Sequence, residues 1–149
     1  MANILRTGFF VISIIICAII SYFQATFKMP FDISPTFFLM IIISIKYGFP
    51  QSIIFVIISS IIPAIIAGGE VGLPSFLFLG SFAFQSFLSN IINLDIIYLG
   101  IILSTLNLTL GYFINKIVGW EGGFVNSLVN YFANIIYFLQ FGSFLMGFL

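Results

Sequence analysis

The sequence predicts an all-α integral membrane protein, folded as a compact bundle of about six transmembrane helices in one domain over residues 1–149. Hydrophobic residues make up 62% of the chain and charged residues only 5%, and the mean hydropathy is +1.30. A water-soluble domain has about 25% charged residues, so this chain could not keep a solvated surface. A transmembrane helix needs about 20 residues, which leaves almost no length for domains outside the membrane.

Six apolar segments are separated by residues that favour turns. The first follows Arg6 and has no small-residue cleavage site, so we expect a retained helix rather than a signal peptide. Pro35 and Pro74 stand at first-turn positions of the second and fourth segments, and Asp95 is placed to cap the fifth. The expected spans are residues 7–24, 35–46, 51–67, 74–92, 95–114 and 124–147.

The stretch 34–72 is expected to form a helical hairpin at the centre of the bundle. Its first arm is too short to cross a bilayer core of roughly 30 Å, so longer neighbours must shield it. Its second arm contains Ser59, Ser60 and Pro63, which are poor choices against lipid. Packed helices can re-bond the carbonyl that a proline leaves free, so this arm is also expected inside the bundle.

The charged and metal-ligating residues exclude several classes of function. All charged side chains fall at predicted helix ends or in loops, and none lies in mid-span, where ionisable groups mark ion paths and proton relays. The chain has no His and a single Cys, Cys17, and it has no basic cluster for nucleic acid. We therefore expect no enzymatic activity, no metal, no cofactor and no nucleic-acid partner.

The last segment carries a stripe of amides. Asn126, Asn130 and Asn134 recur every four residues, which places them on one helix face. A buried amide costs free energy unless it is hydrogen-bonded, so the stripe must face protein, water or a ligand. Two interpretations stay open: the amides join helices, at about 0.6 kcal/mol per bond, or they contact a ligand.

Two loops are expected on the same side of the membrane, near the start of this stripe. Polar groups beside an aromatic ring at the mouth of a bundle could hold a small polar ligand. The alternative is that they are ordinary interfacial loops, for which tryptophan is well suited. With the stripe, the candidate ligand-binding residues are Asn126, Asn130, Asn134, Trp120, Glu70 and Glu121.

Two segments carry small residues at spacings that permit close helix packing. In the first segment these are Ser13, Cys17, Ser21 and Ala25. In the fifth they are Gly100, Ser104, Asn107 and Gly111. The first set either packs within the bundle or forms a docking seam for another membrane subunit.

Loop charges favour a cell-membrane orientation with the N-terminus and C-terminus in the cytoplasm. This topology places Arg6, Lys46 and Asp95 on the cytoplasmic side. The more acidic opposite side then holds Lys28, Asp32, Glu70, Lys116 and Glu121. Lys and Arg are evenly divided, so only the net charge favours this orientation.

The layout resembles two known families. The stretch SPTFFLMIIISIKYGFPQSIIFVIISSIIPAIIAGG, with its Pro-led short helix, Gly turn and second helix, is followed by an Asn-bearing sixth segment. This pattern is similar to the substrate-binding S component of energy-coupling-factor (ECF) vitamin transporters and to rod shape-determining MreD proteins. S components often carry an A-x-x-x-A docking seam in the first helix, and Ser13, Cys17 and Ser21 have that spacing here. Residues 59–63 replace the Gly-rich, Asp-ended third helix of many MreD proteins.

The resemblance implies a membrane subunit without enzymatic activity. As an S component, the chain would bind a small vitamin-like nutrient under the 68–72 and 118–123 loops and would dock on a membrane coupling subunit. The Asn stripe would hydrogen-bond the ligand, Trp120 would stack on it, and Glu70 or Glu121 would contact a positive group. As a MreD-like scaffold, the chain would bind partner membrane proteins in envelope assembly and no ligand.

Overall fold

The structure is a computed structural model that describes residues 2–29, 32–120 and 122–149. Every regular element within these ranges is helical. Two long helices are each interrupted by one π-helical turn, at Ile57–Ile61 and at Phe138–Gly142. The α-helices are α1 (Ala2–Thr26), α2 (Thr36–Tyr47), α3 (Phe49–Val56), α4 (Ile62–Ile66), α5 (Leu73–Ile91), α6 (Ile96–Val118), α7 (Gly123–Tyr137) and α8 (Ser143–Phe148).

A helix forms at each of the six predicted segments, and Asp95 caps α6 by accepting a hydrogen bond from the Ile97 N–H at 2.9 Å. Four helices are long and apolar enough to cross a membrane. They are Ile4–Thr26, Phe49–Ile66, Ile96–Val118 and Gly123–Phe148. α2 is apolar but shorter, and α5 has the length but too many polar residues to join this group.

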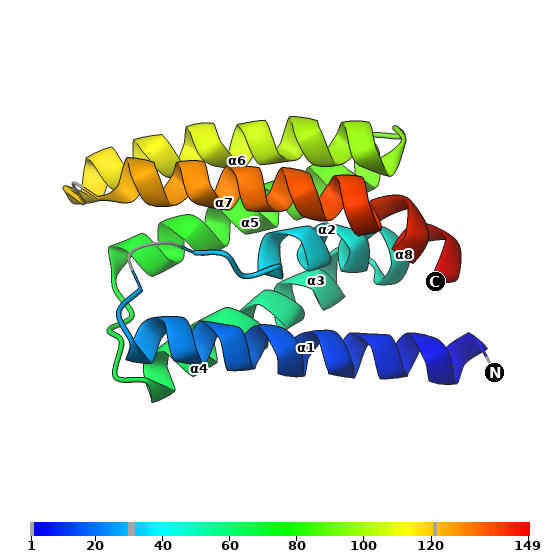
Figure 1. Cartoon of the computed structure of the whole chain (residues 1–149), viewed down its shortest axis with the longest axis horizontal. Coiled ribbons are helices and arrows are strands. Elements are labelled where there is room, and N and C mark those ends of the chain that lie inside the picture. Colours follow the sequence, from blue (N-terminus) through cyan, green and yellow to red (C-terminus); the bar gives the residue numbers. More distant parts are fainter. Residues whose placement is uncertain (1, 30–31, 121) are drawn as a thin grey trace.

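α2 lies at the centre of the bundle (Figure 1). All of its residues from Thr36 to Ser44 are buried, and it packs on α3, α5, α7 and α1. The prediction of a short, shielded first arm is therefore confirmed. The second arm is peripheral instead, because it exposes one apolar side along its length, including Ile54 and Ile66. The opposite side of this arm, with buried Ser59, faces the bundle.

Pro63 is accommodated by the π-helical turn that precedes it. A proline lacks the N–H that an α-helix needs and clashes with the preceding turn. The wider turn ends at Ile62, whose N–H donates to the Ile57 carbonyl five residues back. Pro63 itself is buried, on the part of the hairpin that packs against α1.

The small residues of α1 also face this hairpin. Ser13 and Cys17 are buried, and Ser21 is half-buried, where α1 packs on the Ile57–Ile61 turn and α4. The small residues of α1 therefore allow close packing of this helix on the hairpin within the same chain. The docking interpretation is wrong for Ser13 and Cys17, because in this fold they are not accessible to another subunit. Ala25, at the end of the stripe, is half-buried.

Close contact between α6 and α7 depends on the predicted small-residue face. A Cβ atom at Gly100 would lie 2.2 Å from Cγ of Phe138, and one at Gly111 would lie 2.8 Å from Oγ of Ser127. The two helices run side by side along most of their length (Figure 1). This confirms the prediction of close helix approach on α6.

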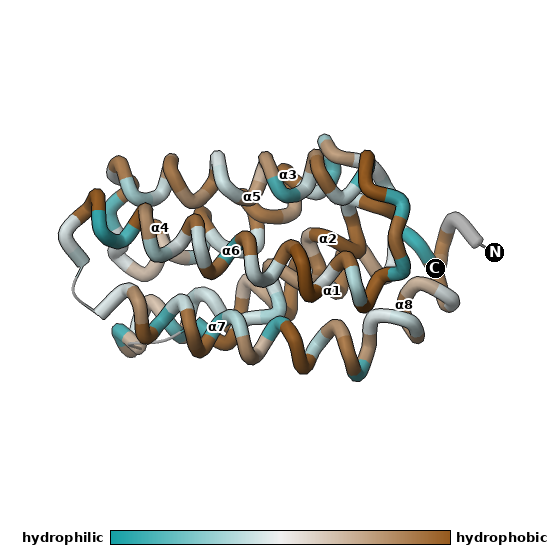
Figure 2. The backbone as a smooth tube through the Cα atoms, turned by 90° about the horizontal axis from the view of Figure 1, so that it is seen from above, coloured by the Kyte–Doolittle hydropathy of each residue, from teal (hydrophilic) through white to brown (hydrophobic). Residues whose placement is uncertain are grey.

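The bundle buries polar as well as apolar side chains and exposes many large apolar ones. On α5, for example, Ser81, Gln85 and Ser86 are buried, whereas Phe84 and Phe87 are half exposed. Apolar residues run along the helices from end to end (Figure 2). In a water-soluble protein, charged and polar residues are instead mostly exposed.

Candidate functional site

A cavity of about 220 Å³ opens between α2, α5, α6 and α7, at the end of the bundle that holds the α6–α7 turn. We call it the amide cavity. Its polar lining consists of Asp32, Thr36, Ser60, Asn107, Asn126, Ser127 and Asn130. Its aromatic lining consists of Phe37, Phe78, Phe82 and Trp120.

The shortness of α2 brings Asp32 into this cavity. At 1.5 Å per residue, the 12 residues of α2 span only about 18 Å. The helix therefore begins inside the bundle, and the chain that leaves the end of α1 has to run inward to reach it (Figure 1). Asp32 lies on this inward path, partly buried, four residues before α2 begins.

The carboxylate of Asp32 is held by its own segment and by α1. Its Oδ1 accepts a hydrogen bond from the Ser34 N–H at 2.8 Å. With the Gln24 amide turned so that its nitrogen faces the carboxylate, that nitrogen donates to the same oxygen at 3.2 Å. Burial raises the pKa of the Asp32 carboxyl above its ordinary value, and the bonds from Ser34 and Gln24 counteract the increase only in part.

The amide stripe of α7 binds the Asp32 segment. The Asn126 side-chain oxygen accepts the Asp32 backbone N–H. The Asn130 side-chain nitrogen donates to the Asp32 carbonyl at 3.3 Å and lies 3.4 Å from carboxylate Oδ2. Asn126 and Asn130 thus fix where the inward segment crosses α7.

The network continues across three helices. Asn130 Oδ1 accepts from Asn134 Nδ2 at 2.8 Å and from Asn107 Nδ2 on α6 at 3.3 Å. Asn107 Oδ1 in turn accepts from Gln85 Nε2 on α5 at 3.0 Å. Within the described part of the chain, Gln85 Oε1 and Asn134 Oδ1 are buried without a hydrogen-bond partner. The network is connected but not closed, which is uncommon for buried polar atoms.

The structure brings together three of the predicted ligand-binding residues. Trp120, Asn126 and Asn130 line the amide cavity, with Trp120 about half exposed at its edge. Asn134 is on the same face one turn further along, but it is 1% exposed and does not line the cavity. Glu121 lies outside the described residues.

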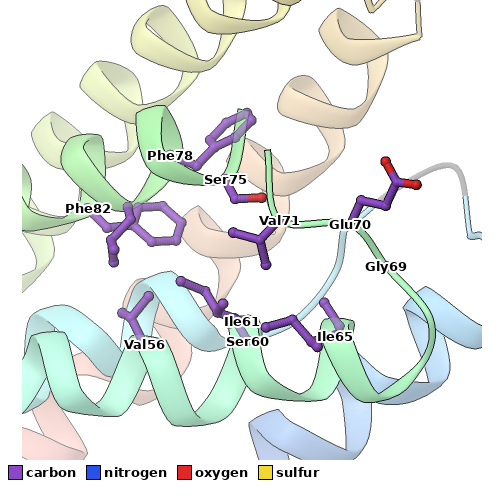
Figure 3. A pocket seen from close by; sticks show the side chains of 12 residues that line it. Val56, Ser60, Ile61, Ile65, Gly69, Glu70, Val71, Ser75, Phe78 and Phe82 are labelled. Atoms are coloured by element: carbon purple, nitrogen blue, oxygen red, sulfur yellow. The ribbon is translucent and has the colours of Figure 1, made fainter. Parts of the chain in front are cut away.

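Glu70 belongs to a neighbouring cavity of about 160 Å³. This second cavity shares Ser60, Phe78 and Phe82 with the amide cavity and is otherwise mostly apolar. The Glu70 carboxylate points away from the apolar side chains that line it (Figure 3). Glu70 therefore stands at the rim, and the predicted grouping of Glu70 with Trp120 in one cavity is wrong, because the 67–72 loop reaches only the second cavity.

Sequence reasoning missed Asp32 and Asn107 as cavity residues. The sequence predicts a loop at Asp32, and the structure places this residue in the cavity because the following helix is short. Asn107 was assigned to a packing face, where it stands out as the only amide among small residues.

Comparison with known proteins assigns neither a family nor a function to this chain. No family model matches the chain, and no curated protein or solved structure matches it. The similarity to S components and to MreD proteins therefore stays a prediction, and function has to be argued from the amide cavity itself.

Proposed function

We propose that this chain is an integral membrane protein that binds a small polar solute in the amide cavity and catalyses no reaction on it. Its place would be that of an S-component-like, solute-binding subunit of a transporter. The observation that carries the proposal is the convergence of Asp32, Asn107, Asn126 and Asn130 from three separate segments on one cavity.

The distribution of polarity supports a membrane location. Four helices have the length and composition to cross a bilayer. Large apolar side chains are exposed along the outer faces of α1 and α6, including Ile12, Ile19, Ile102 and Phe113. Soluble monomers rarely expose contiguous apolar surface on this scale. In a cell membrane this exterior would face lipid, with both termini on the predicted cytoplasmic side.

The chemistry of the amide cavity supports binding of a small polar molecule. Ligand sites are typically concave, with aromatic or apolar walls and a few polar groups that fix orientation. The aromatic walls and the amides of Asn107 and Asn130 provide both parts. At about 220 Å³, the cavity is below the roughly 300–1,000 Å³ usual for drug-sized ligands, so the expected solute is small.

The alternative proposal is a MreD-like scaffold that binds membrane proteins and no solute. It is favoured by one observation: Asn107, Asn130 and Asn134 hydrogen-bond one another and join α6 to α7. On this account the amides only hold helices together. A partner would then bind the exposed side of α1 rather than its buried small residues.

Native mass spectrometry of the protein, gently purified from its own membrane, distinguishes the two. A solute-binding protein retains a small polar adduct that is lost in Asn130→Leu. Ser86→Ala is the matched control, because Ser86 also makes buried polar contacts but does not line the amide cavity. A scaffold shows no small adduct in any variant and co-purifies with another membrane protein.

A further inference from the structure

The Asp32 carboxylate keeps free hydrogen-bonding capacity toward the amide cavity. A carboxylate has about four acceptor sites. Oδ1 is occupied by Ser34 and Gln24, whereas the contact of Oδ2 with Asn130 Nδ2, at 3.4 Å, is long for a hydrogen bond. Asp32 lines the cavity, so a ligand in it can reach this carboxylate.

No basic side chain of the described residues neutralises Asp32. Neither Lys28, its nearest basic neighbour in sequence, nor any other lysine or arginine there is among the groups that act on this carboxyl. No lysine or arginine lines the amide cavity. A buried carboxyl without a paired cation is favoured in its neutral form, so a cationic ligand would supply the partner that stabilises the carboxylate here.

The walls of the amide cavity are suited to a cation. Phe37, Phe78, Phe82 and Trp120 line it. The face of an aromatic ring attracts an ammonium group, with a gain of about 2 kcal/mol or more where water is excluded. A carboxylate beside several aromatic rings is therefore a combination that selects organic ammonium groups over neutral or anionic ones.

A divalent metal fits this cavity less well. Ca²⁺ takes 6–8 oxygen ligands, and Mg²⁺ demands near-octahedral oxygen geometry. Among the described residues, no group of three or more His, Cys, Asp or Glu could hold a metal ion. Among the residues that the structure describes, the cavity presents a single carboxylate, and the Asn126 and Asn130 side-chain oxygens already accept protein hydrogen bonds.

We infer that the solute of the amide cavity is a small organic cation, a protonated amine whose ammonium group is bound by the Asp32 carboxylate and whose apolar part lies between Phe78, Phe82 and Trp120. This inference rests on the proposed solute-binding function. The ammonium donates hydrogen bonds to Asp32 Oδ2, and the apolar part extends toward the second cavity, which shares Phe78 and Phe82.

Three probes of the same shape test the charge preference: benzylammonium, benzyl alcohol and benzoate. Trp120 is the only tryptophan in the chain and lines the amide cavity, so its fluorescence reports binding without a label. The titration uses the full chain in nanodiscs of zwitterionic lipid at neutral pH. Asp32→Asn keeps an oxygen to accept the Ser34 N–H, and Asp95→Asn is the control with the same charge change at the opposite end.

We expect benzylammonium to bind the unmodified protein most tightly. Asp32→Asn weakens it by about 10- to 100-fold, the loss expected for one charge-assisted hydrogen bond, and Asp95→Asn leaves it unchanged. Equal affinity for benzylammonium and benzyl alcohol, unaltered by Asp32→Asn, overturns the cation inference but leaves solute binding in place. If benzoate binds most tightly, the cation inference is likewise overturned and solute binding stays in place.

The adduct retained by the native protein provides a second and independent readout. An adduct with a basic nitrogen supports the cation inference, whereas a neutral or acidic adduct overturns it and leaves the proposed function standing. If no probe binds saturably and no small adduct is retained, both the cation inference and the solute-binding function fail.

Discussion

Two polar clusters lie inside this bundle, and they differ in how completely they are bonded. The first, here called the serine cluster, joins α2, α3 and α5 near the end that holds the termini. Its members are Ser44, Ser52, Ser86 and Asn90. Ser44 Oγ donates to the Ser86 carbonyl at 2.9 Å, and Ser86 Oγ donates to Ser44 Oγ at 2.9 Å.

The second is the amide network around Asp32, Asn130 and Asn107. Here Gln85 Oε1 and Asn134 Oδ1 are buried without partners in the described chain. None of the hydroxyls in the serine cluster is left without a partner in this way. Small side chains that bond one another completely have the properties of helix–helix contacts, whereas an open network around a carboxylate has those of a binding site.

The largest expected effect is a loss of stability from overpacking α6 where Gly100 meets Phe138. Gly100→Ala places a Cβ atom against Phe138, which is fully buried and packs edge-on against Phe38 at 4.9 Å. The ring has little room to move, so α6 must separate from the Phe138–Gly142 turn that follows α7. We expect unfolding to become easier by about 1–3 kcal/mol, measured as a lower melting temperature in nanodiscs.

Gly80→Ala is the matched control for that substitution. Gly80 is exposed in the interior of α5, and a Cβ atom there meets nothing within 4 Å. Alanine favours the helix by up to about 1 kcal/mol over glycine, so this variant should melt at the same temperature or higher. Equal destabilisation by both alanines would contradict the close α6–α7 contact.

Asn130→Leu should affect binding more than stability. The substitution removes a cavity-lining amide, the acceptor of two hydrogen bonds and the donor to the Asp32 carbonyl, while Asn134 Nδ2 keeps its bond to the Asn130 carbonyl at 2.8 Å. Interhelical bonds of this kind contribute about 0.6 kcal/mol each in membranes, so the melting temperature falls only slightly. Solute affinity, measured by Trp120 fluorescence, should fall by about tenfold or more, since a buried ligand group loses its partner.

Ser86→Ala should affect stability and leave binding alone. It removes the bonds of Ser86 Oγ with Ser44 and Ser52, all three of which are buried. The cost is about 1 kcal/mol, seen in the melting temperature. A loss of solute affinity in this variant would show that the serine cluster and the amide cavity are coupled, and would contradict their independence.

The smallest expected effect is a pH dependence of stability that belongs to Asp32. Burial raises the pKa of its carboxyl above 3.8 in the folded chain, so the folded state holds the proton more tightly than the unfolded state. This contribution to stability is therefore fully present below 3.8 and is lost as pH rises through the folded-state pKa. Melting curves over the acidic range should show this decline, and Asp32→Asn should flatten it whereas Asp95→Asn should not.

Much of the helical framework could be predicted from the sequence. Apolar run length and turn residues located the helices, and the shortness of the second segment placed α2 in the centre. The four-residue spacing of Asn126, Asn130 and Asn134 placed them on one face, as the bond from Asn134 to Asn130 confirms. These features depend on local periodicity, which the sequence displays directly.

The contacts of the candidate site depend on how deep each segment lies in the bundle. Local sequence patterns do not encode this depth. In the sequence, Asp32 lies in a predicted loop. Its position against Asn130 of α7 follows only from the packing of α2. The bond between Asn107 and Gln85 joins two helices whose relative rotation the sequence does not specify. Ser13 and Cys17 had the spacing of a seam, but which partner covers that seam is decided by the fold.

The most direct test of the central claim, that the amide cavity is a binding site and not only a contact between helices, compares two variants in one measurement. The melting temperatures of Asn130→Leu, Ser86→Ala and the unmodified chain are recorded with and without saturating benzylammonium. A ligand that binds only the folded state raises the melting temperature, by an amount that grows with the logarithm of its concentration relative to its Kd. We predict the full increase in Ser86→Ala, despite its lower starting value, and a smaller increase in Asn130→Leu, because its affinity is lower by about tenfold or more. Equal increases in both variants would contradict the claim.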